Sequence, residues 1–196
     1  MTARDPNIEQ DVRDMVRRIV DGIFGEDAGA PVATDVADDI GIGQDVRTIA
    51  IGGDHGGFAL KERLGFKLKE EGFTVIDRGT DSTEAVDYPD IAASVARTVR
   101  SGEADVGIII DGAGIGSAMA ANKIPGIRAA LCYDVSTARN AREHNHANVL
   151  TLGAGLIGDA LAWQITQEFL STPFGGGRHA RRVDKINDLD STVLER

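Results

Sequence analysis

The chain has 196 residues, of which 21 are Lys or Arg and 31 are Asp or Glu, so its formal net charge is −10. An apolar fraction of 42% is typical of a packed globular protein, and the acidic balance argues against a protein that binds a nucleic-acid backbone. No apolar run predicts a membrane span or a signal peptide, and the single cysteine, Cys132, excludes an internal disulfide. We therefore expect a cytoplasmic protein with no nucleic-acid partner and no membrane partner.

The acidity is concentrated at the start of the chain. Residues 1–46 hold eleven acidic and four basic side chains, a net charge of −7, which leaves −3 for the other residues. Apolar residues spaced by three and four predict an amphipathic helix from about residue 7 to 24, and a segment rich in Gly, Ala and Asp follows it. We expect residues 1–46 to be an extension and residues 47–196 to be the main domain.

Beyond the extension, short apolar runs alternate with helical patterns. Strands are expected at about 48–51, 73–76, 106–110, 127–131 and 148–151. Helices are expected at about 60–68, 88–99, 117–122, 135–143 and 158–171, and a basic loop leads into a terminal helix. The alternation predicts an α/β fold with three α-β-α layers, Rossmann-like, around a doubly wound parallel sheet of five strands. Such folds bind ligands beyond the carboxyl ends of the strands.

Polar residues follow the first expected strand, in the run GGDHGG. Asp54 and His55 lie there between paired glycines, which allow a polar ligand to approach the backbone closely. This pattern favours a ligand contact over the alternative, a turn in which Asp54 caps the next helix.

A second glycine-rich run, DGAGIG, follows the third strand and opens a helix. Its backbone N–H groups predict a cradle for a phosphate group or for an oxygen that gains negative charge. A dinucleotide fingerprint would be G-x-G-x-x-G after the first strand, so this run does not predict NAD binding. Asp111, at the mouth of the cradle, fits either a helix cap or a general base.

Two further runs carry histidine and arginine. The segment 142–146 precedes the fifth strand, and a histidine at the ligand-binding edge is a candidate acid or base. His144 and His146 have no nearby Cys or carboxylate triad and form a poor metal site, so we expect no metal and no other cofactor. Arg178 and Arg182 belong to a cationic run that suits either a phosphate group or salt bridges on a helix surface.

Several segments together resemble the ribose-5-phosphate isomerase B and galactose-6-phosphate isomerase family. They keep the family order from about residue 48 to residue 190, and the run Ala120–Lys123 and the pair His144–Asn145 make the resemblance specific. The segments are GGDHGGFALKERL, Asp87-Tyr88-Pro89, DGAGIGSAMAANKIPGIRAALC, REHNHANVL and GGGRHARRVDKI.

The resemblance implies a metal-independent aldose–ketose isomerase of phosphorylated sugars, with ribose 5-phosphate and ribulose 5-phosphate as the first expectation. Such an enzyme opens the sugar ring and moves a proton between C1 and C2 through a cis-enediolate. Residues 47–196 would form this isomerase domain. The implied catalytic residues are Asp111, His144, Gly112, Gly114 and Gly116. The implied substrate-binding residues are Asp54, His55, Tyr88, Asn145, Arg178 and Arg182.

Within these sets the resemblance assigns distinct roles. His144 resembles the acid/base that opens the ring, and the three glycines would stabilise the enediolate. Arg178 and Arg182 resemble the residues that hold the phosphate, and in this family a neighbouring subunit typically delivers them. The resemblance therefore implies a dimer or tetramer with active sites at the subunit interface.

The chain departs from the family pattern in its site. Asp111 replaces the usual cysteine base, and Ser117 occupies the position where some members have a glutamate base. Ala113 replaces a threonine thought to help ring opening, and Gly155 replaces an arginine that often contacts the phosphate. We expect Asp111 to be the base. The alternatives are an isomerase of a tetrose or hexose phosphate, of the galactose 6-phosphate type, and a subunit that binds sugar phosphate without catalysis.

The extension requires its own interpretation. Residues 1–46 resemble the encapsulation peptides that direct enzymes into bacterial microcompartments, which would add a shell or lumen protein as a partner. The alternative is a helix that packs on the main domain or across an oligomer interface.

Overall fold

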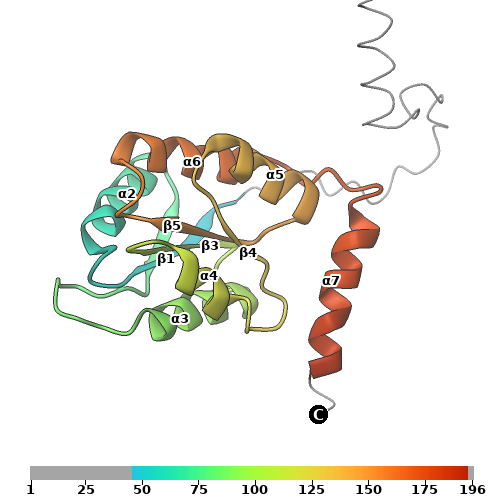
Figure 1. Cartoon of the computed structure of the whole chain (residues 1–196). Helices are drawn as coiled ribbons and strands as arrows, with labels where there is room; N and C mark the ends of the chain where they lie inside the picture. The colour runs from blue at the N-terminus through green and yellow to red at the C-terminus, as the bar shows by residue number, and fades with distance from the viewer. Residues whose placement is uncertain (1–45, 194–196) are drawn as a thin grey trace, which may run out of the picture. The chain divides into compact units, whose positions relative to one another are not determined.

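The computed structural model describes residues 46–193, with side chains up to Asp190, and its core is one parallel sheet (Figure 1). The strands are β1 (Thr48–Gly53), β2 (Thr74–Asp77), β3 (Val106–Asp111), β4 (Ala129–Leu131) and β5 (Val149–Gly153). They lie in the order β2-β1-β3-β5-β4. The predicted fold class is confirmed, whereas the helix predicted at 7–24 lies outside the described residues.

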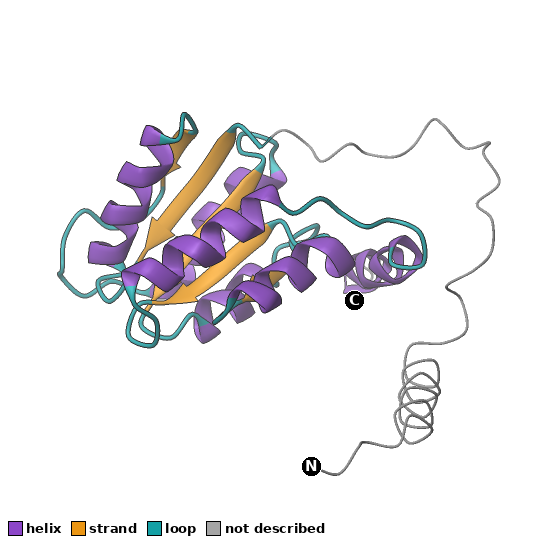
Figure 2. Ribbon diagram, turned by 90° about the horizontal axis from the view of Figure 1, so that it is seen from above, coloured by secondary structure: helices purple, strands orange, loops and turns teal. Residues whose placement is uncertain are grey.

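Helices cover both faces of the sheet, as Figure 2 shows. They are α2 (Phe58–Glu70), α3 (Tyr88–Arg100), α4 (Ile115–Ala121), α5 (Val135–Asn145), α6 (Asp159–Ser171) and α7 (Ala180–Val193). Buried side chains of α2, α5 and α6 pack on one face, and those of α3 and α4 pack on the other. No helix in this part of the chain is long and apolar enough to cross a membrane.

Strand β3 shows why the sequence pattern predicts the sheet so well. All of its residues are buried, and successive side chains alternate between the two faces. Ile108 and Ile110 face α2, α5 and α6, whereas Ile109 faces α3 and α4. A strand covered by helices on both faces requires apolar residues at every position, which the run GIII supplies.

The strand order places the two polar loops side by side. From β1 the chain moves to β2 on one side, and it then returns to β3 on the other side of β1. The strand order therefore reverses between β1 and β3, where doubly wound sheets open a crevice for ligands. Asp54 follows β1 and Asp111 ends β3, and the Asp54 N–H donates to the carbonyl of Ile110 at 3.2 Å.

Most predicted boundaries differ from the structure by one or two residues, and two of these differences have a clear cause. Helix α4 begins at Ile115, two residues before the predicted start, because the Asp111 side chain accepts hydrogen bonds from backbone N–H groups of the turn and of the first helical residues. Strand β4 begins at Ala129 and not at Ile127, since the backbone N–H of Arg128 donates to the side chain of Asn148 at 2.8 Å. The terminal helix α7 stands away from the sheet and meets the end of α5 (Figure 1).

Candidate active site

Asp111 lies inside the glycine-rich turn and not at its open mouth. Its side chain is 5% exposed. Oδ1 accepts hydrogen bonds from the N–H groups of Ala113 and Gly114, and Oδ2 accepts from the N–H and the hydroxyl of Ser117. Four donors match the four lone-pair directions of a carboxylate. Asp111 therefore caps α4, as one of the two sequence interpretations proposed.

Two glycines of this run are required by their surroundings. Gly114 has a φ of 77°, in the left-handed region that favours glycine. A Cβ atom on Gly116 would lie 2.5 Å from ring carbons of Tyr88, the first residue of α3. The Tyr88 ring thus packs directly against the backbone of the cradle, so these two segments, distant in sequence, lie in contact.

The cradle also has N–H groups that no other described residue uses. The N–H of Gly114 is donated to Asp111, whereas those of Gly112 and Gly116 form no hydrogen bond within residues 46–193. These two groups are the donors that remain for a ligand oxygen. Tyr133, which the sequence analysis missed, closes the turn from behind because its hydroxyl donates to the carbonyl of Ala113 at 2.8 Å.

Asp54 and His55 lie beside this cradle. Asp54 is buried, and its Oδ1 accepts from the N–H of Gly57 at 2.9 Å, while Oδ2 forms no hydrogen bond within the described part. His55 is exposed, and its Nδ1 accepts from the N–H of Val86 at 3.3 Å. An accepting Nδ1 places the proton of a neutral imidazole on Nε2, which is then a donor. Asp54 therefore both caps its turn and keeps one oxygen for a ligand.

We call Asp54, His55, Tyr88, Asp111 and Gly112–Gly116 the cradle cluster. A second group, the arm cluster, consists of His144, Asn145, Arg178, His179 and Arg182 at the end of α5 and the start of α7. In it, the rings of His144 and His179 are stacked with centroids 4.2 Å apart and an angle of 3° between their planes. Asn140 hydrogen-bonds to Nδ1 of His144 at 2.7 Å and also accepts from the side chain of Asn145 at 3.2 Å.

The arm cluster carries two arginines, and the carboxylate of Glu143 lies beside it, 3.8 Å from Nε2 of His144. Partial desolvation, followed by the proximity of His144, Arg178 and Arg182, lowers the pKa of His179 below its ordinary value. Arg178 and Arg182 are exposed, and neither forms an ion pair with another described residue. No described residue supports the salt-bridge alternative for these arginines. Nε of Arg178 donates to Nε2 of His179 at 3.5 Å, and the other guanidinium nitrogens of both arginines are available to an anion.

The two clusters lie at opposite ends of the strands: the cradle cluster at the carboxyl ends and the arm cluster at the amino ends. Helix α5 starts after the carboxyl end of β4 and runs back for 11 residues, so His144 lies beside the amino end of β5. Asp111 pairs with Gly153 at the other end of that strand. The expectation of a histidine at the ligand-binding edge is thus wrong within one chain. The two clusters are separated by at least the length of β5, roughly 13 Å for five residues.

Comparisons with known proteins identify the family to which this fold belongs. A model of the family described as Ribose/Galactose Isomerase matches residues 49–186. "Ribose-5-phosphate isomerase B" of Escherichia coli (strain K12) is 44% identical over 145 residues, which cover 74% of this chain and 97% of the relative. The structure of ribose-5-phosphate isomerase B from Clostridium thermocellum is 50% identical, with a TM-score of 0.74 over 74% of this chain and 99% of that one.

A further relative was solved with a sugar phosphate. Ribose-5-phosphate isomerase B from Mycoplasma genitalium, with bound ribulose-5-phosphate, is 42% identical, with a TM-score of 0.71 over 74% of this chain and 96% of that one. The fold and the match along nearly the whole domain define an isomerase of phosphorylated sugars. The chain belongs to the ribose/galactose isomerase family.

Proposed function

We propose that the chain interconverts ribose 5-phosphate and ribulose 5-phosphate in a site that two copies of the chain build together. The observation that carries this proposal is the division of the candidate residues into two clusters at opposite ends of the strands of one sheet. The cradle cluster offers a carboxylate and backbone donors, whereas the arm cluster offers the cations that a phosphate needs. A second copy can bring its arm cluster to the cradle of the first, in a dimer or a larger assembly.

The proposed base is Asp111, which takes the proton that moves between C1 and C2. Because its carboxylate accepts four hydrogen bonds, it must release one lone pair before it can accept a proton. Three of the donors are backbone N–H groups fixed by the turn, and the fourth is the Ser117 hydroxyl, which can rotate about its own bond. Rotation of this hydroxyl would free Oδ2 for the substrate.

The other groups of the cradle cluster match the charge that the reaction develops. The free N–H groups of Gly112 and Gly116 would stabilise the negative oxygen of the enediolate. Oδ2 of Asp54 can accept from a sugar hydroxyl, and Nε2 of His55 can donate to an oxygen of the substrate.

The arm cluster of the second copy would complete the site. Arg178 and Arg182 would hold the phosphate, and His144 would transfer the proton that opens the ring, with Asn145 beside it. Hydrogen bonding of His144 to Asn140 fixes the ring that this transfer requires.

A direct assay tests the proposal. The purified full chain should convert ribose 5-phosphate faster than phosphorylated tetroses and other pentose or hexose phosphates. Asp111→Asn should lower kcat by about a hundredfold or more, as expected for loss of a general base. Near-normal turnover by a folded Asp111→Asn variant would contradict the assignment of the base, and preference for a tetrose or hexose phosphate would contradict the substrate.

A second candidate function is a subunit that binds sugar phosphate without catalysis. The full hydrogen bonding of Asp111 favours it, because a carboxylate that only caps a helix needs no free lone pair. Incorporation of solvent deuterium at C2 of the sugar distinguishes the two functions. An isomerase exchanges the proton at C2 for deuterium, whereas a subunit that only binds the sugar incorporates no deuterium.

Residues 1–45 lie outside the described residues, and their sequence supports two roles. The first is delivery of the enzyme into a bacterial microcompartment, and the second is packing on the main domain or across an oligomer interface. A fluorescent reporter fused to residues 1–46 distinguishes them in a host that forms compartments. Sequestered fluorescence supports delivery, and diffuse fluorescence supports packing.

A further inference from the structure

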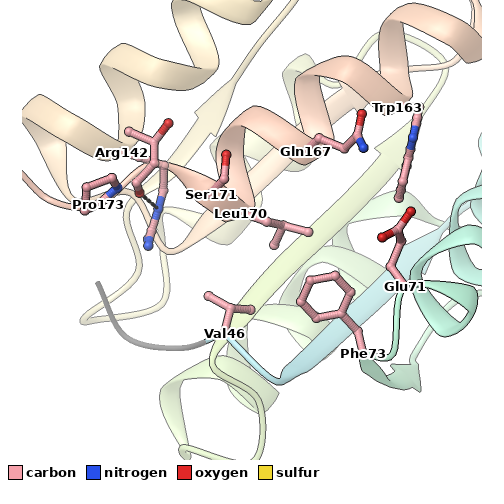
Figure 3. A pocket seen from close by; sticks show the side chains of 10 residues that line it. Val46, Glu71, Phe73, Arg142, Trp163, Gln167, Leu170, Ser171 and Pro173 are labelled. Carbon is pink, nitrogen blue, oxygen red and sulfur yellow. Dashed lines mark hydrogen bonds between the residues drawn. The ribbon is translucent and has the colours of Figure 1, made fainter. Parts of the chain in front are cut away.

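A cavity of about 520 Å³ lies at the amino ends of β1 and β2, away from the cradle cluster. Its apolar floor is formed by Val46, Phe73 and Leu170, where the end of α6 passes over the start of the sheet (Figure 3). This volume is within the range that accommodates a small organic ligand. None of the catalytic or binding residues proposed above lines it.

Arg142 supplies a buried positive charge at one side of this cavity. Its side chain is 6% exposed, and it donates to the carbonyl oxygens of Ala147 at 2.7 Å and Thr172 at 3.4 Å. No carboxylate among residues 46–190 pairs with it, and Nη2 forms no hydrogen bond there. Burial, and secondly the charge of Arg128, lowers the pKa of Arg142. Buried cations are normally paired with an anion, whereas among residues 46–190 this one meets only the two carbonyl groups and the Phe169 ring, whose centroid is 5.3 Å from Cζ.

The opposite side of the cavity differs in chemistry. Figure 3 shows Glu71 and Trp163 there, with Val46, Phe73 and Leu170 between them and Arg142. A carboxylate on that wall disfavours a ligand that is anionic throughout. The Trp163 ring offers a flat apolar wall, which suits a planar group. The cavity thus fits a ligand with one anionic end and an apolar or aromatic body.

We propose that this cavity binds a small organic monocarboxylate whose carboxylate meets Arg142 and whose apolar body lies on Val46, Phe73 and Leu170. Two of the five N–H donors of the guanidinium are engaged with backbone carbonyls, so both donors of Nη2 are left for a carboxylate. A carboxylate there compensates the buried charge. The apolar floor supplies the hydrophobic contribution. The site is independent of the proposed isomerase reaction.

The chain provides its own reporter for this ligand. It contains a single tryptophan, Trp163, which lines the cavity. Titration of the full chain with phenylacetate should produce a saturable change in tryptophan emission. Phenylacetamide has nearly the same shape without the charge, and it should bind about tenfold more weakly or worse, the loss expected when a charge-assisted hydrogen bond becomes neutral.

Two variants on α6 form a matched pair. Gln167 lines the cavity, and Gln164 does not, and both side chains are exposed. Gln167→Glu adds a negative charge to the lining and should weaken phenylacetate binding about threefold or more, whereas Gln164→Glu should leave it unchanged. These variants avoid the risk that Arg142→Gln fails to fold, since Arg142 also ties two carbonyl groups together.

Three results would overturn the proposal. They are the absence of a saturable change at millimolar phenylacetate, equal affinity for phenylacetamide, and equal effects of the two glutamate variants. A saturating concentration of ribose 5-phosphate should leave the titration unchanged. Competition between the two would place phenylacetate in the candidate active site and would also contradict the proposal.

Discussion

The hydroxyl of Ser117 donates to Oδ2 of Asp111 at 2.5 Å, and Ser117 is fully buried. This hydrogen bond must break before Oδ2 of Asp111 can accept a proton as a base. Ser117→Ala keeps the backbone donor and removes the hydroxyl, so one lone pair of the carboxylate becomes free.

We therefore expect Ser117→Ala to retain or raise kcat for ribose 5-phosphate, while it lowers the free energy of unfolding by about 1–3 kcal/mol. Steady-state kinetics and urea unfolding measure the two effects. If Ser117→Ala loses as much activity as Asp111→Asn, the pair serves only to hold the turn.

Close packing of Tyr88 on the cradle predicts a strong effect of Gly116→Ala. The new methyl group would meet the Tyr88 ring at 2.5 Å, so the ring must move. Because Tyr88 is expected to line the substrate pocket, KM should rise, and overpacking should cost about 1–3 kcal/mol of stability. Gly65→Ala is the control, since its Cβ would meet nothing within 4 Å and a helical alanine is favourable. Equal KM values for the two variants would contradict the placement of Tyr88.

The two-copy site predicts recovery of activity in mixtures. Asp111→Asn damages only the cradle cluster, and Arg178→Ala damages only the arm cluster. In a dimer, mixing equal amounts after subunit exchange should restore about a quarter of the wild-type sites, because half of the dimers are mixed and each carries one intact site. Activity of the mixture that never exceeds the average of the two variants would show that each chain uses its own two clusters.

Because Cys132 is buried, we expect its thiol to react slowly with alkylating reagents. The side chain is 1% exposed, and desolvation raises the pKa of its thiol to about 11. Because the thiolate is the reactive form, iodoacetamide near neutral pH should modify the native chain far more slowly than the urea-unfolded chain. Mass spectrometry measures the extent of modification. Rapid labelling that inactivates the native protein would contradict this location of the thiol.

We expect His146 to make the stability of the folded chain decrease at acidic pH. Burial, followed by the charges of Arg128 and Arg142, lowers the pKa of His146 below 6.5. The unfolded chain therefore takes up this proton first as the pH falls, so stability declines below about pH 6.5 until the folded-state pKa is passed. His146→Asn suits the backbone φ of 48° but loses the ring stacked on Phe174, so we expect lower stability at about pH 7.5.

The variant should nevertheless lose less stability than the wild type between about pH 7.5 and about pH 5.5. Urea unfolding at both pH values measures this difference. An unchanged pH dependence would mean that other groups control the acid sensitivity.

The sequence predicted most of the sheet because β3 and its neighbours are apolar on both faces, a pattern that few other structures produce. It also predicted the glycine cradle, since close backbone approach requires glycine at positions such as Gly114 and Gly116. It could not predict that Asp111 turns inward, because the donors that hold it appear only when the turn is closed. The edge at which His144 lies could have been predicted, because a helix that connects two parallel strands must run back to their amino ends. Arg142 gave no signal of burial, because an arginine in a helical segment is usually exposed.

The distance between the two clusters has a consequence for how the protein behaves in the cell. If each reaction site needs groups from two chains, a lone chain is inactive however well it folds, and the rate per chain falls on dilution below the dissociation constant of the assembly. Catalysis then depends on local abundance, so any process that gathers the chains into a small volume switches the enzyme on without changing a single bond.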